Sequence, residues 1–146
     1  LIETVLPRSK PTQSHPATRS FQAIRIAINK EYKELFDGLF SAEKALSSGG
    51  YLVLVTFHSI EDRIVKRFIQ ARTGKLHSTS RYMPGTDDIE AQFTKVTRKA
   101  VKPSMDEISI NPRSRSAKLR IAKRTNIKPG QSLDLEELNV PIVGGY

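Results

Sequence analysis

The spacing of apolar residues predicts a long helix in the first third of the chain. From Phe21 to Leu46 the apolar positions recur every three or four residues, which places them on one face of an amphipathic helix. Pro16 suits the first turn of such a helix, and the pair Gly49-Gly50 favours its end. We therefore expect one continuous helix that begins near His15.

A strand and a second helix follow directly. Residues 51–57, YLVLVTF, are apolar at consecutive positions, which is more typical of a strand covered on both faces in a parallel sheet than of an edge strand. Ser59, with an acidic residue three positions later, predicts the N-cap of a helix over residues 60–72. Ligand sites in α/β sheets gather at the carboxyl ends of strands, so we expect Phe57, His58 and Ser59 in a functional position.

The second helix carries basic residues opposite its apolar side. Arg63, Lys66, Arg67 and Arg72 form either a solvated face or a stripe that contacts phosphates, and the pattern leaves both open. Its first turn holds Glu61 and an adjacent aspartate, where the helix dipole favours acids, so we expect structural roles for them.

The rest of the chain predicts two further strands. Residues 73–91 lack periodicity and indicate a long surface loop, whereas residues 93–101 alternate as a strand does. A Ser-x-x-Glu capping box at Ser104 predicts a short helix to about Ile110. After a turn, the alternation over residues 117–124 predicts the last strand, with apolar residues on one face and basic residues on the other.

Composition and charge narrow the function classes. The 146 residues allow one domain, and 24 Lys and Arg against 15 Asp and Glu give a net charge of +9. That excess favours a polyanionic partner, but basic proteins are common, so charge alone leaves RNA binding open. The absence of cysteine excludes disulfides, thiolate metal ligands and cysteine nucleophiles, and we expect no metal site. No apolar run approaches the roughly 20 residues of a membrane span, so we expect a soluble cytoplasmic protein.

Three segments, in the same order, carry a family resemblance. HPATRSFQAIRIAIN, TFHSIEDRIVKRF and NPRSRSAKLRIAKR together resemble the ribosomal RNA small subunit methyltransferase H family, over roughly residues 7–125. The resemblance implies an α/β class I (Rossmann-like) methyltransferase fold and use of S-adenosyl-L-methionine. It also implies methylation of the exocyclic N4 of a cytidine in the decoding region of 16S rRNA, with the small ribosomal subunit as partner.

The resemblance further implies that this chain is the C-terminal half of such an enzyme. In the family, a glycine-rich turn, an acidic residue and an Asp-Leu-Gly segment come first, and this sequence, which begins with Leu1, contains none of them. We therefore expect the fifth to seventh strands of the sheet, with the last pair antiparallel. We also expect the cofactor site mainly upstream, no cofactor-binding residue in this chain, and no activity of the chain by itself.

The expected organisation has three parts. Residues 1–14 would be a linker from a missing upstream helical region, residues 15–125 the C-terminal half of the methyltransferase domain, and residues 126–146 a flexible tail. Two rivals remain: a non-catalytic RNA-binding or ribosome-assembly module derived from such an enzyme, and a methyltransferase of the same superfamily with another substrate. Nothing in the sequence indicates the oligomeric state.

His58 is the candidate nearest to the chemistry. Methylation of N4 mainly requires that the amine be oriented toward the methyl donor, so we assign His58 to lining the site or contacting the target base, with a direct chemical role left open. His15 either caps the first helix or faces the site. The arginines bind either phosphates or carboxylates. The residues expected to contact substrate RNA are His15, Arg19, Arg25, Phe57, His58, Ser59, Arg63, Lys66, Arg67, Arg113 and Arg115.

Overall fold

The structure is a computed structural model that describes residues 2–5, 15, 17–74, 91–131, 133 and 138. Its helices and strands, in chain order, are α1 (Ile2–Val5), α2 (Ala17–Asn29), α3 (Glu31–Ala45), β1 (Tyr51–Thr56), α4 (Ser59–Arg72), β2 (Phe93–Lys95), α5 (Met105–Ile110), the 3-10 helix η1 (Pro112–Ser116) and β3 (Lys118–Arg124). Most of the predicted linker and of the predicted loop over residues 73–91 lies outside the described residues. Ser104 accepts a hydrogen bond from the backbone N–H of Glu107, which confirms Ser104 as the N-cap of α5.

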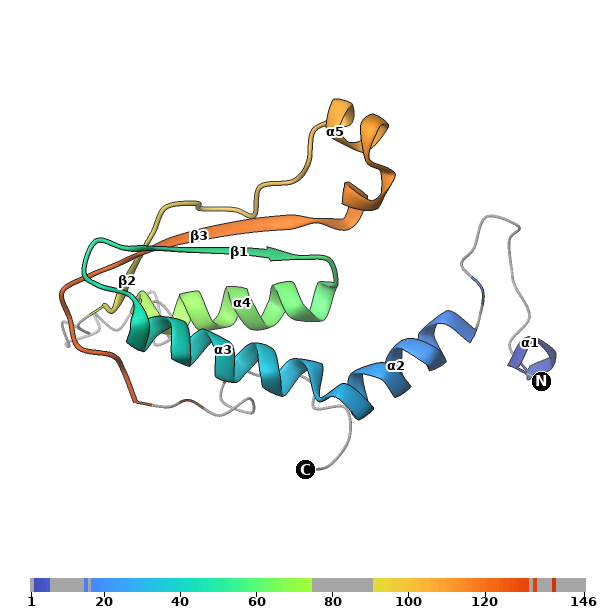
Figure 1. Cartoon of the computed structure of the whole chain (residues 1–146), viewed down its shortest axis with the longest axis horizontal. Helices are drawn as coiled ribbons and strands as arrows, with labels where there is room; N and C mark the ends of the chain where they lie inside the picture. The colour runs from blue at the N-terminus through green and yellow to red at the C-terminus, as the bar shows by residue number, and fades with distance from the viewer. Residues whose placement is uncertain are drawn as a thin grey trace, which may run out of the picture.

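The strands form a sheet in the order β1-β3-β2, with β3 antiparallel to both neighbours (Figure 1). The expected antiparallel pairing of the last strands is therefore confirmed. β2 is shorter than the predicted strand because Val96 and Thr97 both donate their backbone N–H to the Ile121 carbonyl, which disrupts the ladder as a bulge does. Pairing resumes only at Val101, which bridges to Leu119.

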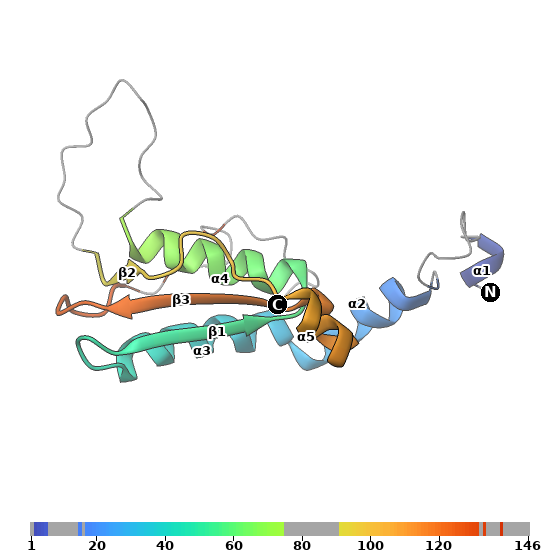
Figure 2. The same cartoon turned by 90° about the horizontal axis from the view of Figure 1, so that it is seen from above.

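Helices α3 and α4 lie side by side against one face of the sheet (Figures 1 and 2). Between the helices and the sheet lies the apolar core, in which Phe68 and Phe93 are fully buried. Phe40 meets Phe68 edge-on, with 5.4 Å between ring centroids, a favoured aromatic geometry. Burial of each such side chain contributes about 2 kcal/mol, so this layer holds the fold together.

β1 differs from the expectation of a strand covered on both faces. Leu52 and Thr56 face the helices and are buried, but Tyr51, Val53 and Val55 on the other face are each more than half exposed. In the described part of the chain β1 pairs only with β3, so it is an edge strand of this sheet. The described residues therefore cover one face of this apolar strand and leave the other face exposed.

The predicted continuous first helix is broken at Lys30. This residue has φ 50° and ψ 36°, the left-handed conformation, and separates α2 from α3. The carboxylate of Glu31 holds the joint, because it accepts from Arg25 Nε at 2.7 Å and from Asn29 Nδ2 at 3.3 Å. These contacts lie across the break between α2 and α3, which the apolar periodicity alone does not predict.

We expect Lys30→Gly to raise the free energy of unfolding by about 1 kcal/mol, because glycine adopts the left-handed conformation without the steric cost of a Cβ. Urea denaturation of the variant measures the change. Lys30→Ala removes the same side chain but keeps the Cβ, so it serves as the control and should give no gain. An equal gain in both variants would assign the effect to the lysine side chain and contradict the backbone explanation.

The first residues of the predicted tail pack against the core. Glu43 Oε1 accepts the backbone N–H of Gly130 at 3.0 Å, and Arg72 Nη2 donates to the Gln131 carbonyl at 2.6 Å. Leu138 is 1% exposed and belongs to the hydrophobic core. A buried polar pair and an apolar contact thus hold these described residues against the core, while most of the predicted tail lies outside the described residues.

That polar pair also corrects the predicted basic face of α4. The side chain of Arg72 is 6% exposed and that of Glu43 is 1% exposed, and Arg72 Nε lies 2.9 Å from Glu43 Oε2. The guanidinium also lies over the rings of Phe40 and Phe68. Arg72 is thus an interior residue that joins α4 to α3 and is not part of a phosphate-contacting stripe.

Candidate functional site

A cleft of about 380 Å³ lies at the carboxyl end of β1, between α2, the start of α3 and the start of α4. It is lined by three residues that the sequence placed in a functional position, Phe57, His58 and Ser59. The residues that complete it are Gln22, Ala23, Ile26, Tyr32 and Ile60. We call this the His58 cleft; its volume falls in the range of small-molecule sites.

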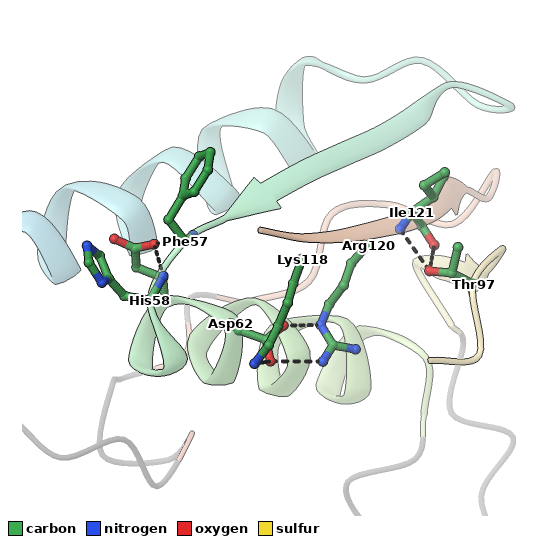
Figure 3. A network of polar contacts seen from close by, with 8 residues as sticks. Phe57, His58, Asp62, Thr97, Lys118, Arg120 and Ile121 are labelled. Atoms are coloured by element: carbon green, nitrogen blue, oxygen red, sulfur yellow. Dashed lines mark hydrogen bonds and ion pairs between the residues drawn. The ribbon is translucent and has the colours of Figure 1, made fainter. Parts of the chain in front are cut away.

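The turn before α4 places His58 at the cleft. His58 is the N-cap residue, with an extended backbone at φ −113° and ψ 149°. The Glu61 carboxylate accepts the backbone N–H groups of both Phe57 and His58, each at 3.1 Å (Figure 3). Ser59 is already the first helical residue, so the prediction that it is the cap is wrong: the cap lies one residue earlier, at His58, and forms a capping box with Glu61.

His58 is held from the far side of the cleft by Gln22 of α2. Gln22 Nε2 lies 3.2 Å from His58 Nδ1, at hydrogen-bond distance. When the amide nitrogen donates, Nδ1 accepts, and a neutral ring carries its proton on Nε2. Nε2 makes no hydrogen bond with the described residues, so this N–H remains available to a ligand. Sequence reasoning missed Gln22, and its place within the first family motif was the only available signal.

The cleft walls combine aromatic and aliphatic groups. Tyr32 is 5% exposed, and burial raises the pKa of its hydroxyl, with the charges of Glu61 and Glu31 adding to the effect. The phenol therefore stays neutral at physiological pH. Phe57 is 51% exposed at the rim. Such an aromatic face can stack on a nucleobase, and His58 offers a hydrogen-bond donor to a base edge.

The other candidates in the first helical region lie outside the cleft lining. His15 Nδ1 accepts the backbone N–H of Ala17 at 3.1 Å, which is the helix-capping alternative. Arg19 lies in α2, but its side chain is outside the described residues. Arg25 is paired with the Glu31 carboxylate, whose pKa is lowered by that hydrogen bond.

The remaining basic candidates fall on two surfaces. Arg63 and Lys66 are exposed on α4, and Arg67 is half-buried there. Arg113 and Arg115 are exposed in η1, which lies at the same end of the sheet as the start of α4 but on the opposite face (Figure 1). The structure thus brings Phe57, His58 and Ser59 together and leaves the η1 arginines apart from them.

Asp62 has the structural role expected of it. Its carboxylate accepts from Arg120 Nε at 2.7 Å and Nη2 at 3.2 Å, and from Lys118 Nζ at 3.1 Å (Figure 3). Two basic residues of β3 therefore face the helices, while Leu119 and Ile121 share the face of the exposed β1 residues. The network connects the first turn of α4 to β3, and this turn also carries Ser59 and Ile60 of the His58 cleft.

This network predicts a pH dependence. Burial raises the pKa of the Asp62 carboxyl, but the hydrogen bonds from Arg120 and Lys118 outweigh burial and hold it below its ordinary value. The stabilisation of the fold by ionised Asp62 is complete above about pH 4, the pKa of this carboxyl in the unfolded chain. It is lost as the pH falls through the lower pKa that the carboxyl has in the folded protein. We expect Asp62→Asn to be less stable at neutral pH and to lose less stability on acidification. Urea midpoints across this range measure both; an unchanged acid limb in Asp62→Asn would contradict the assignment.

Comparison with known proteins decides the family. The model of the MraW methylase family matches residues 1–125. The chain belongs to the MraW methylase family. Its α/β sheet with the antiparallel last pair accordingly belongs to the class I methyltransferase fold.

Relatives within this family are closely similar to the chain. It is 56% identical over 141 residues to a ribosomal RNA small subunit methyltransferase H of Ruegeria sp., and 52% identical over 143 residues to one of Roseobacter denitrificans. These matches cover 97% and 98% of the chain but 43% of each relative. The chain therefore spans less than half the length of the curated relatives that it matches.

The described residues do not by themselves fit S-adenosyl-L-methionine. The His58 cleft has no carboxylate among its lining residues to bind ribose hydroxyls, and no glycine-rich turn follows β1, where His58 and Ser59 stand. The cleft chemistry matches a nucleobase better than a cofactor. In the described part of the chain, no helix is both long and apolar enough to cross a membrane.

Proposed function

We propose that this chain forms the C-terminal part of an S-adenosyl-L-methionine-dependent methyltransferase that modifies N4 of a cytidine in the decoding region of 16S rRNA. The observation that carries the proposal is the His58 cleft, which lies where α/β sheets bind ligands. Further support comes from the family and from the relatives, which are named as small-subunit rRNA methyltransferases. The assembled enzyme would act in the cytoplasm on the small ribosomal subunit.

In this proposal the cleft receives the target base. His58 Nε2–H donates to an acceptor of cytosine, the exocyclic O2 or the ring N3, and Gln22 keeps the imidazole in the orientation and tautomer that this requires. Phe57 stacks on the base, and the aliphatic residues of the cleft contact its edge. The residues present thereby orient the amine, which is the main requirement of this transfer. When bound, S-adenosyl-L-methionine supplies the methyl group.

The cofactor is bound, in this proposal, mainly by residues upstream of this chain. Among the described residues, one edge of β1 has no partner strand. Three apolar residues of α2 are more than half exposed: Phe21, Ile24 and Ile28. Apolar surface of this extent on two neighbouring elements marks a contact site. The upstream part of the relatives would cover it and complete the sheet beside β1.

A chimera tests this function. The upstream part of the Ruegeria relative, joined to this chain, is expressed in bacteria that lack their own enzyme of this type, and 16S rRNA nucleosides are analysed by mass spectrometry. We expect N4-methylcytidine to appear, and the chain without the upstream part to yield none. A folded chimera that binds the cofactor but leaves 16S rRNA unmodified would favour the non-catalytic RNA-binding module.

A further inference from the structure

A second, smaller hollow lies farther along α4 from the His58 cleft. Three structural segments form it: α4, the loop after β2, and β3. We propose that this basic pocket binds a phosphate group of the RNA backbone; the inference rests on the proposed function, since it names how the same RNA is held. The residues that line the basic pocket are Lys66, Ile69, Gln70, Lys95, Thr97, Arg98 and Arg120.

The lining is strongly cationic. Lys66, Lys95, Arg98 and Arg120 contribute to it, and none of its lining residues is acidic. Asp62 binds Nε and Nη2 of Arg120, but Nη1 makes no hydrogen bond with the described residues. Lys66 and Arg98 are exposed. Closely spaced cations without a lining carboxylate create a positive potential that attracts a phosphate.

The walls of the pocket are fixed before any ligand binds. Thr97 Oγ1 accepts the backbone N–H of Ile121 at 3.0 Å (Figure 3), and the backbone N–H of Thr97 donates to the Ile121 carbonyl at 3.2 Å. These bonds fasten the loop after β2 to β3, while Arg120 is held by Asp62. Lys95 and Arg98 therefore flank the pocket on an anchored segment, which lowers the entropic cost of binding.

The size of the pocket selects the ligand. Its volume of about 40 Å³ has room for a few water-sized atoms. That suits the oxygens of a phosphate but not a nucleobase, for which the larger His58 cleft has room. The two sites thus match the two components of a nucleotide chain, a base and a backbone group.

One face of α4 connects the two sites. Ser59, Arg63, Lys66 and Gln70 follow the i, i+4, i+7, i+11 spacing of a single helix face, and the first three are exposed. Ser59 lines the cleft and Lys66 lines the pocket, about 10 Å apart at 1.5 Å per residue. An RNA strand whose target base enters the cleft can therefore lay its backbone along Arg63 and place a nearby phosphate in the basic pocket.

RNA binding across a salt series tests the proposal. A short fluorescein-labelled single-stranded RNA is titrated with the 146-residue chain and with the double variant Lys66→Gln/Arg98→Gln, and anisotropy gives the affinity at each salt concentration. We expect the double variant to lose about tenfold in affinity near 0.1 M salt and about 0.7 of a unit of the log–log salt slope, the value for one phosphate neutralised on a single strand. The matched control Lys44→Gln/Lys128→Gln removes two exposed lysines elsewhere and should retain the slope of the unchanged chain.

Two further arms separate the outcomes. Lys66→Arg/Arg98→Lys keeps both charges, and its binding should stay near that of the unchanged chain; circular dichroism checks that each variant is folded. Inorganic phosphate at matched ionic strength should compete with RNA for the unchanged chain more than for the double variant. Equal slopes for the double variant and the control would overturn the proposal, as would loss of phosphate competition without loss of RNA affinity. If the unchanged chain binds no RNA at all, the basic-pocket proposal is overturned, whereas the proposed function is judged separately by methylation with the chimera.

Discussion

Replacing Arg72 with methionine is expected to lower the free energy of unfolding by about 3 to 5 kcal/mol, because it leaves a buried carboxylate without its counter-ion. Glu43 is 1% exposed and has Arg72 Nε at 2.9 Å as its charged partner. The change also removes the donor to the Gln131 carbonyl and so releases the segment that follows β3. Against a total stability of typically 5 to 15 kcal/mol, urea denaturation should resolve this loss easily.

An exposed ion pair on the same helix as Glu43 supplies the control. Lys33 and Asp37 of α3 are paired, and their side chains are 47% and 53% exposed. Asp37→Ala should therefore cost less than about 1 kcal/mol. The double variant Glu43→Met/Arg72→Met removes both charges and should be more stable than Arg72→Met alone. If Arg72→Met costs no more than Asp37→Ala, the buried pair does not hold α3, α4 and the last segment together.

Replacing His58 with alanine is expected to lower kcat/KM of the methylating chimera by about tenfold, the equivalent of one lost hydrogen bond of about 1.4 kcal/mol. The reason is the loss of the Nε2–H donor to the target base. His58→Gln keeps a donor in the same place and should retain more activity than alanine. Rates with 16S rRNA and binding of S-adenosyl-L-methionine, measured in parallel, separate substrate positioning from cofactor binding.

Gln22 gives this prediction an internal check. Because Gln22 acts through the His58 ring, Gln22→Ala should lower activity in the wild-type background and have little further effect once His58 is alanine. Additive losses would show that the two residues act independently. Full activity of both His58 variants would show that the imidazole does not contribute to recognition of the base.

The elements predicted from the sequence are those whose signals are local. The apolar spacing of α4 and the serine cap of α5 each lie within one turn or a few turns of helix, and both are confirmed. The break at Lys30 was missed because lysine is not a helix-breaking residue and rarely adopts the left-handed conformation that it has here. The cap of α4 was misassigned to Ser59 because serine followed by an acid three residues later resembles a capping box, whereas the box in the structure is formed one residue earlier, by His58 and Glu61.

The remaining differences come from contacts between residues distant in the sequence. Arg120 and Arg72 both appear as surface charges in the pattern, yet each is drawn inward by a carboxylate, Asp62 or Glu43. The segment after β3 was expected to be flexible because nothing in its local sequence indicates its contact with Glu43, which lies 87 positions earlier. For the site, the position of Phe57, His58 and Ser59 followed from strand topology, whereas Gln22 comes from a helix whose placement periodicity does not predict.

Histidine NMR tests most directly whether the His58 cleft receives the target base. The sequence contains three histidines, so the ring signals of isotope-labelled protein are readily assigned with His58→Gln. On titration with a cytidine-containing RNA strand, we expect the His58 ring signals to shift more than those of the other histidines. We also expect this shift to be larger than the shift caused by an otherwise identical strand that carries uridine in place of the cytidine. RNA that binds, as judged by anisotropy, while the His58 signals stay unchanged would contradict it.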